Sequence, residues 1–135
     1  MNDKVFFDTN VLVYAYSNTE PDKQVIARKL IAESVSYVST QVLKELTNTL
    51  TKKFRNSWQE AKNAVLESSK NNLLYTNEIQ TILNACDIAD RYKLSFYDSL
   101  IIAAALECEC SILYSEDMQD TQTIEGNLKI VNPFK

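Results

Sequence analysis

The chain contains no histidine among its 135 residues. Histidine is the side chain that titrates nearest to neutral pH, and it supplies the usual general base of enzymes and the commonest zinc ligand. Its absence excludes the Ser/His/Asp and Cys/His nucleophile systems. A catalytic site in this protein must therefore be built from other groups.

Glycine is almost absent as well, since Gly126 is the single glycine of the chain. The Gly-rich phosphate loop and the dinucleotide-binding fingerprint each need several glycines close to the end of a strand. Nucleotide binding of these two kinds is therefore excluded.

Long apolar runs and a signal-peptide pattern are also missing, and the cysteines are few and odd in number: Cys86, Cys108 and Cys110. We therefore predict a cytoplasmic protein with reduced thiols and no membrane association. A lone Cys-Glu-Cys at residues 108–110 is a weak metal pattern, and plain structural thiols are the simpler interpretation. The net charge of -4 argues against a strongly basic nucleic-acid binder but permits a local basic patch.

Length and composition fit a single domain over residues 1–135. Strand and helix patterns alternate without repeats, which is typical of an α/β sheet. Five short strands are expected at residues 5–7, 37–38, 73–75, 111–114 and 128–131. We predict a three-layer α/β/α fold with a central, mostly parallel five-stranded sheet covered on both faces.

Apolar periodicity predicts the helices of this fold, at residues 21–35, 40–54, 58–69, from about 77, and 97–106. The second of these carries a buried stripe of Val42, Leu46, Leu50 and Phe54. The helix near residue 77 is predicted to turn an inner face of apolar residues to the core: Ile79, Ile82, Leu83, Cys86 and Ala89. The run at 100–106 is apolar nearly all round, which predicts a central, buried helix.

Acidic residues follow the strands of this sheet. Asp8 ends the first strand, and Asp117 comes just after the strand at 111–114. Glu45 lies in the second turn of the helix after the second strand, and Asp98 lies in the first turn of the buried helix. Because ligands in such sheets bind outside the carboxyl ends of the strands, these four acids are predicted to meet at one edge.

Converging carboxylates raise one another's pKa unless protons or a bound cation neutralise them. With no histidine available, Mg²⁺ or Mn²⁺ is the expected partner, because these hard ions prefer oxygen ligands and take substrate phosphate as a further ligand. The constellation therefore predicts phosphate-ester hydrolysis, in which two such ions activate the attacking water and stabilise the leaving oxygen.

Each acid also has an ordinary structural explanation. Asp8 suits a turn, Asp98 suits a helix N-terminus, and Glu45 suits a solvated helix face. Asp117 and Asp120 suit a polar loop. Only the joint placement of the acids in this order of strands and helices favours a site.

Four segments, taken in order, closely resemble the PIN domain, and the nearest subgroup is the VapC-type toxins. They are residues 6–12 (FFDTNVL), 38–46 (VSTQVLKEL), 94–105 (LSFYDSLIIAAA) and 112–117 (ILYSED). The resemblance spans the whole chain, from the first strand to the last. The Asp-Thr-Asn start is common by itself, whereas the four segments together are specific.

The resemblance implies a Mg²⁺- or Mn²⁺-dependent endoribonuclease whose acidic cluster is Asp8, Glu45, Asp98 and Asp117. Asp8 would be the central metal ligand, Asp98 and Asp117 would share the metals, and Glu45 would hold a metal or its water. Asp120 is a substitute or partner for Asp117 in this implied set. The resemblance also gives supporting hydroxyls that hydrogen-bond the site, Thr9 and Ser115.

The resemblance further implies a toxin of a toxin-antitoxin pair, with RNA as substrate, an antitoxin protein as partner, and a homodimer. The helices at 22–35 and 40–54 would receive the antitoxin tail. Four cations near that groove are candidates for guiding RNA phosphates, although a solvated helix end is the more common explanation of such residues: Lys44, Lys52, Lys53 and Arg55. Tyr14, Tyr16 and Tyr97 are candidates for base stacking, with core packing as the alternative for Tyr97.

Two other classes of protein are alternatives. One also places acidic residues at the edge of a parallel sheet, and the other shares the PIN fold. A receiver or phosphatase-like module is disfavoured, because the phosphatase pattern needs a second aspartate where this chain has Asn10. A non-catalytic PIN-fold module that binds RNA or protein is the second alternative. The presence of all four acids argues against loss of the site.

Overall fold

The computed structural model describes residues 3–135 and contains one six-stranded sheet, in the order β3-β2-β1-β4-β6-β5. All neighbouring strands pair in parallel except β5 and β6, which are antiparallel. The strands are β1 (Lys4–Phe7), β2 (Val35–Ser39), β3 (Leu73–Tyr75), β4 (Ile112–Tyr114), β5 (Thr123–Ile124) and β6 (Leu128–Val131).

The predicted mostly parallel α/β sheet is confirmed, with six strands in place of five. The additional strand, β5, is only two residues long and lies within a polar segment, so it has no period-2 apolar pattern. It pairs with β6 across a tight turn at Gly126, where φ is +72°. The single glycine of the chain thus lies at a position that favours glycine sterically.

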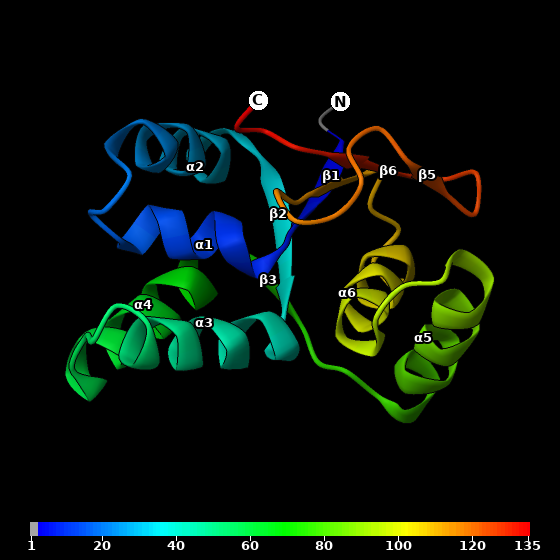
Figure 1. Cartoon of the computed structure of the whole chain (residues 1–135), viewed down its shortest axis with the longest axis horizontal. Helices are drawn as coiled ribbons and strands as arrows, with labels where there is room; N and C mark the ends of the chain where they lie inside the picture. The colour runs from blue at the N-terminus through cyan, green and yellow to red at the C-terminus, as the bar shows by residue number, and fades with distance from the viewer. Residues whose placement is uncertain (1–2) are drawn as a thin grey trace.

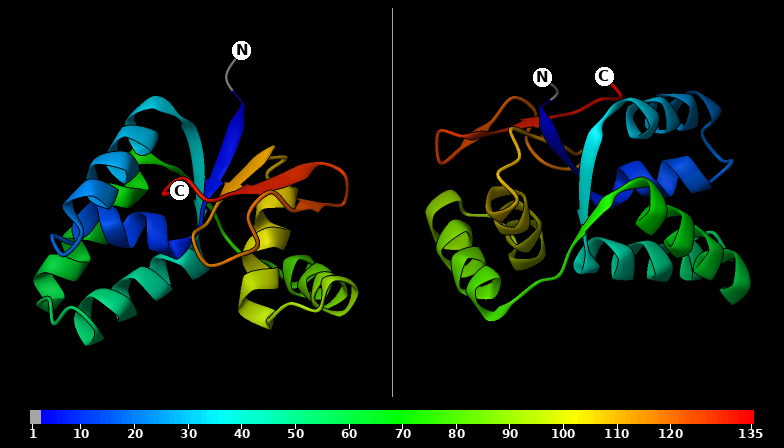
Figure 2. Two further views of the ribbon diagram at one scale, coloured as in Figure 1. Left: turned by 45° about the horizontal axis from the view of Figure 1, so that its top comes forward. Right: turned by 180° about the vertical axis from the view of Figure 1, so that it is seen from behind.

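Six helices cover the two faces of the sheet, and Figures 1 and 2 show α1 to α4 on one side and α5 and α6 on the other. Their bounds are α1 (Thr9–Tyr16), α2 (Pro21–Glu33), α3 (Thr40–Lys52), α4 (Trp58–Asn71), α5 (Ile79–Tyr92) and α6 (Phe96–Glu107). Serine side chains cap three of them: Ser39 accepts from Val42 N, Ser57 from Glu60 N, and Ser95 from Asp98 N. Within residues 3–135, every helix is too short or too polar to span a bilayer.

The hydrophobic core lies between the sheet and its helices, and the predicted central position of α6 is confirmed. Residues from Leu100 to Ala105 of α6 are all buried. Most helix ends differ from the predicted ranges by one or two residues, and one helix, α1, was not predicted. Val35 begins β2 rather than ending α2, and α1 follows β1 directly, burying Val11, Leu12 and Val13.

The predicted inner face of α5 is wrong. Ile79 is 77% exposed, Leu83 is 53% exposed, and Ile82 and Cys86 are also exposed, whereas Thr81, Ala85 and Ile88 face the core. Small side chains suit this contact, because Ala85 packs closely against Leu100 and Ala103 of α6. Thr81 is fully buried because its hydroxyl has partners in Tyr75 and Glu107. The apolar stripe of α5 therefore faces outward.

The cysteines are free thiols, with Cys108 and Cys110 buried. Burial raises the pKa of the Cys108 thiol to about 11 and that of Cys110 to about 12. Both are therefore protonated at neutral pH and unreactive as thiolates.

Sheet order determines where the candidate site lies. The chain runs outward from β1 to β2 and β3, then returns to place β4 on the other side of β1, which makes the β1–β4 border the switch point of the sheet. Phe7 pairs with Tyr114 at the carboxyl ends of these two strands. Asp8 and the segment that begins at Ser115 therefore leave the sheet side by side.

Candidate active site

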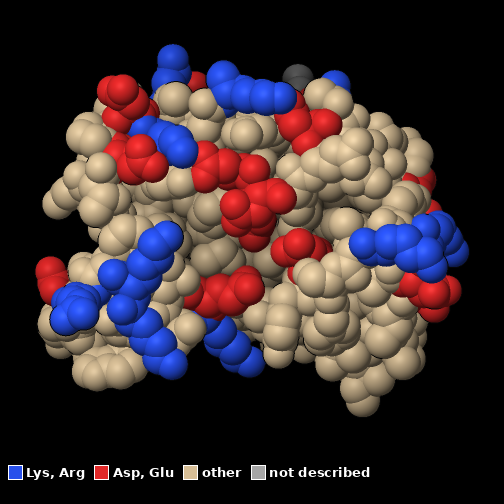
Figure 3. Space-filling view, viewed as in Figure 1, with Lys and Arg blue, Asp and Glu red and all other residues tan. Residues whose placement is uncertain are grey.

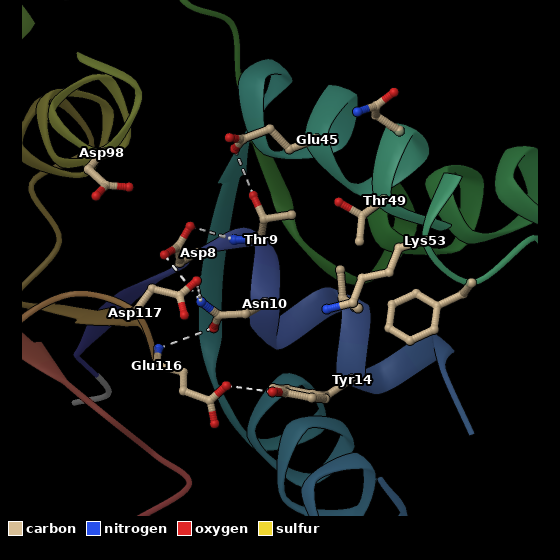
Figure 4. Close-up of a pocket in the computed structure, with 13 residues that line it drawn as sticks. Asp8, Thr9, Asn10, Tyr14, Glu45, Thr49, Lys53, Asp98, Glu116 and Asp117 are labelled. Atoms are coloured by element: carbon tan, nitrogen blue, oxygen red, sulfur yellow. Dashed lines mark hydrogen bonds between the residues drawn. The ribbon is translucent and has the colours of Figure 1, made fainter. Parts of the chain in front are cut away.

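A pocket of about 500 Å³ opens at the carboxyl edge of the sheet, beside the β1–β4 border (Figure 4). Figure 3 shows acidic side chains gathered around the hollow on this face. Its lining comes from α1, α3, α6 and the loop after β4: Asp8, Thr9, Asn10, Val13, Tyr14, Glu45, Asn48, Thr49, Lys53, Phe54, Asp98, Glu116 and Asp117. All four predicted acids, Asp8, Glu45, Asp98 and Asp117, are in this set.

Asp8 is the most deeply placed of these acids, with 5% of its surface exposed. Its Oδ1 accepts a hydrogen bond from Thr9 N at 2.7 Å, and its Oδ2 accepts one from Ser115 Oγ at 2.7 Å. Burial raises the pKa of Asp8 to about 6; the hydrogen bonds from Ser115 and Thr9 oppose this shift, and the charges of Asp98 and Glu45 add to it. A buried carboxylate under repulsion from two others attracts a cation.

Ser115 links Asp8 to the loop that carries Asp117. Its hydroxyl is fully buried, donates to Asp8, and accepts from the backbone N–H groups of Asp117 at 3.2 Å and Met118 at 3.3 Å. The predicted supporting position of Ser115 is therefore matched by direct contact with Asp8.

Glu45 and Asp98 approach Asp8 from the two opposite helical layers. Glu45 Oε2 accepts a hydrogen bond from Thr9 Oγ1 at 2.8 Å, and burial, followed by the charge of Asp98, raises the pKa of Glu45. Asp98 lies in the first turn of α6, where Ser95 caps the helix, and points toward Asp8 in Figure 4. Thr9 thus contacts Glu45 just as Ser115 contacts Asp8.

Asn10 is a site residue that the sequence reasoning considered only as a departure from the phosphatase pattern. Its Nδ2 donates to Asp117 Oδ2 at 3.1 Å and lies 3.4 Å from Asp8 Oδ2, while its Oδ1 accepts from Glu116 N at 3.2 Å (Figure 4). The amide therefore lies between two acids of the cluster. The signal in the sequence was its place two residues after Asp8, which puts it in the first turn of α1.

Glu116, Tyr14 and Lys23 form a second group that the sequence did not reveal. The Glu116 carboxylate accepts from Tyr14 Oη and from Lys23 Nζ. Burial acts to raise the pKa of Glu116, but these hydrogen bonds outweigh it and the pKa is lowered. Because Lys23 belongs to α2, which carries no motif, only the folded chain brings it into contact with Tyr14 and Glu116, which line the pocket.

Several predicted positions lie away from the pocket. Asp120 accepts from Asn132 N at 2.8 Å and from Lys135, so Asp117 is the loop acid that lines the pocket. Of the predicted RNA-guiding cations, Lys53 lines the pocket, whereas Lys44, Lys52 and Arg55 do not. Tyr14 is a lining residue, Tyr16 borders a different cavity, and Tyr97 is 58% exposed, so it is not a core residue.

The donor chemistry of the pocket fits a hard divalent cation, because its charged groups at the deep end are carboxylates. Among residues 3–135, no three acidic, cysteine or histidine side chains converge closely enough to enclose a metal by themselves. Mg²⁺ itself needs only one or two protein carboxylates, because it usually keeps several of its waters.

Comparison with known proteins agrees with this architecture. A family model described as PIN domain matches residues 5–121, and no curated protein matches the chain in sequence. Mycobacterium tuberculosis VapC20, a toxin that cleaves the sarcin-ricin loop, superposes with a TM-score of 0.70 at 19% identity, over 84% of this chain and 89% of that chain.

Two complexes show the same fold. A toxin-antitoxin complex from Klebsiella pneumoniae gives a TM-score of 0.70 at 20% identity, covering 96% of this chain and 97% of that chain. DNA-bound VapBC from Salmonella typhimurium gives 0.65 at 18% identity, covering 96% and 98%. The family match runs from β1 through the loop that carries Asp117. The chain therefore belongs to the PIN domain family.

Proposed function

We propose that this protein is a divalent-metal-dependent endoribonuclease that hydrolyses RNA phosphodiester bonds, and that it is the toxin of a toxin-antitoxin pair in the cytoplasm. The observation that carries the proposal is the state of Asp8, which is buried at the switch point of a PIN fold with its pKa raised to about 6. Glu45, Asp98 and Asp117 line the same pocket. Such a cluster is stable in its ionised form only with a cation.

In this proposal Asp8, Glu45, Asp98 and Asp117 hold Mg²⁺ or Mn²⁺. The bound ion would supply an activated water and charge stabilisation for the leaving oxygen. Ser115 and Thr9 fix the two oxygens of Asp8, and Thr9 also fixes Glu45. Asn10 holds Asp117 near Asp8 through its amide.

The activity is tested by cleavage of single-stranded RNA in Mg²⁺ or Mn²⁺. We expect EDTA and Asp8→Asn each to abolish cleavage while the fold, followed by circular dichroism, is retained. Equal cleavage by the wild type and Asp8→Asn, or cleavage that resists EDTA, would refute the proposal. RNA binding without turnover in any divalent ion would favour a non-catalytic module.

An antitoxin partner is the second part of the proposal. Support comes from the structural neighbours, which include VapBC and other toxin-antitoxin complexes. We expect a small protein encoded beside this chain to co-purify with it and to inhibit RNA cleavage. Absence of inhibition by that protein at equimolar concentration would contradict this part.

A homodimer is the third part, and an exposed apolar surface supports it. We call it the α5 surface: Ile79, Ile82, Leu83, Phe96 and Tyr97, each between 39% and 77% exposed. Figure 3 shows a broad area with few charges at the lower right, over α5 and α6. Contiguous apolar patches of this kind mark interaction sites, and a two-fold interface pairs the same patch on both chains without opposing like charges.

A further inference from the structure

The pocket has a second part, beyond the acidic cluster, that the proposed chemistry does not use. We call it the α3 subsite: Val13, Asn48, Thr49, Lys53 and Phe54. It contains no carboxylate, and it lies between α1 and the carboxyl-terminal half of α3. Its function is therefore open to inference from its own side chains.

The spacing of residues on α3 relates the subsite to the acids. Glu45, Thr49 and Lys53 follow one another at intervals of four residues, so they lie on one face, about 6 Å apart along the axis at 1.5 Å per residue. Lys53 is therefore about 12 Å from Glu45. Figure 4 shows the Lys53 side chain reaching from the end of α3 toward α1. The subsite is thus next to the position of a bond held at the acidic cluster.

Two polar side chains of the subsite, those of Asn48 and Thr49, form no hydrogen bond within the part of the chain that the structure describes. Thr47 and Thr51, on other positions of α3, return their hydroxyls to backbone carbonyls of the same helix at 2.9 Å. Neither the Thr49 hydroxyl nor the Asn48 side-chain amide forms a hydrogen bond with any group in residues 3–135. Both residues border the pocket, so their donors and acceptors are available to a ligand.

The remaining members supply an apolar wall and a charge. Val13 is buried with only 7% of its surface exposed, and Phe54 is partly buried against the core. The Lys53 ammonium lies 5.4 Å from the centre of the Phe54 ring. An aromatic face, an amide, a hydroxyl and one cation are the groups that contact the base plane, the base edge and the phosphate of an unpaired nucleotide.

We propose that the α3 subsite binds the nucleotide adjoining the cleaved bond, and that Asn48 and Thr49 select its base while Lys53 binds its phosphate. The inference rests on the proposed ribonuclease function and specifies how that site chooses RNA. A nucleotide fits better than a peptide here, because the cation lies beside an aromatic ring and beside the unused hydrogen-bonding groups of Asn48 and Thr49 in one pocket.

The test measures binding of fluorescein-labelled RNA hexamers U6, A6 and C6 by anisotropy, in Mg²⁺ and in an Asp8→Asn background that prevents turnover. We expect at least fivefold preference for one base. Adding Asn48→Ala or Thr49→Val should reduce that preference to less than twofold. Asn48 is exposed and Thr49 is half-buried, and neither side chain forms a hydrogen bond within residues 3–135, so circular dichroism should be unchanged.

Lys53 and Lys52 provide a matched pair, since they are adjacent but only Lys53 lines the pocket. Lys53→Gln should weaken all three hexamers about equally, by about fivefold, and lower the slope of log K against log salt by about 0.7, the value for one phosphate contact on a single strand. Lys52→Gln should change affinity by less than twofold.

Three results would overturn the subsite: no base preference in the parent, a preference that survives both Asn48→Ala and Thr49→Val, or equal effects of Lys53→Gln and Lys52→Gln. Failure of every hexamer to bind would also overturn it and leave a peptide as the occupant of the groove. Cleavage assays in the Asp8-containing protein separate the two proposals. If cleavage depends on metal but the Asn48 and Thr49 variants keep the base preference, only the subsite proposal is refuted. If the hexamers bind as expected but no RNA is cleaved, only the nuclease proposal is refuted.

Discussion

Asp8→Asn is expected to stabilise the metal-free protein at neutral pH, although it removes the central acid of the site. Folding moves the Asp8 pKa from its usual 3.8 to about 6, chiefly by burial. A shift of about two units corresponds to about 3 kcal/mol of destabilisation from the ionised side chain at pH 7.5. The hydrogen bonds from Ser115 and Thr9 oppose the pKa shift and are already included in it. Asparagine carries no charge, so its expected gain is up to about 3 kcal/mol.

The pH dependence gives this prediction its sign. Because folded Asp8 binds its proton more tightly than the unfolded chain does, stability falls as pH rises from about 4 to about 6 and is lowest above that range. The advantage of Asp8→Asn should therefore shrink by about 1.4 kcal/mol between pH 7.5 and pH 5. Metal has the opposite effect, because an ion that binds only the folded wild type stabilises it and leaves the variant unchanged.

Urea unfolding in EDTA at pH 5 and pH 7.5, followed by circular dichroism, measures both quantities. Asp117→Asn is the matched control, because Asp117 is an exposed acid of the same pocket, and we expect its effect to stay within about 0.5 kcal/mol. An Asp8→Asn protein that is less stable than wild type at pH 7.5, or a difference that does not change with pH, would refute the reasoning.

Three further predictions concern the surroundings of the site and the α5 surface. Ser115→Ala should lower the free energy of unfolding by about 3 kcal/mol, because it strips Asp8 of a hydrogen bond and leaves two backbone N–H groups without a partner; a loss below 1 kcal/mol in urea unfolding would contradict this. Lys23→Met should lower the free energy of unfolding slightly in low salt, since the Lys23–Glu116 pair is partly exposed and its charges are screened by solvent. The same measurement in 1 M NaCl should show a smaller cost, and an unchanged cost would count against an ionic origin. Ile82→Asp should convert a dimer to a monomer in light scattering, whereas Val25→Asp, at an exposed position on α2, should not; dimers in both variants would exclude the α5 surface.

Much of the fold could be predicted from the sequence, because the apolar patterns that specify helices and strands are local. Alternation of apolar runs placed most helices and parallel strands correctly. Residues 100–106 are apolar on every side of a helix, so that helix must be buried on all sides. The structure confirms this for α6. The order of acids after successive strands predicted one shared edge, because the carboxyl ends of parallel strands lie together.

Amphipathic patterns were less reliable for predicting which side of a helix faces the core when its other side is exposed and apolar. The stripe of Ile79, Ile82 and Leu83 has the spacing of a core face, yet α5 buries Thr81 and Ala85 instead. A periodic stripe shows that a helix buries one side against something, but it does not distinguish the core of its own chain from the surface of another. The partner of that stripe is not encoded in the pattern.

Asp8 illustrates what the sequence by itself determined: a carboxylate at the end of a buried strand. Only the tertiary structure decided which side chains meet it. Lys23 and Glu116 are brought together from segments 93 residues apart, and Asp117 rather than Asp120 lines the pocket. Such contacts depend on the packing of α1, α2 and the loop after β4, and packing is a property of the whole chain that no local pattern contains.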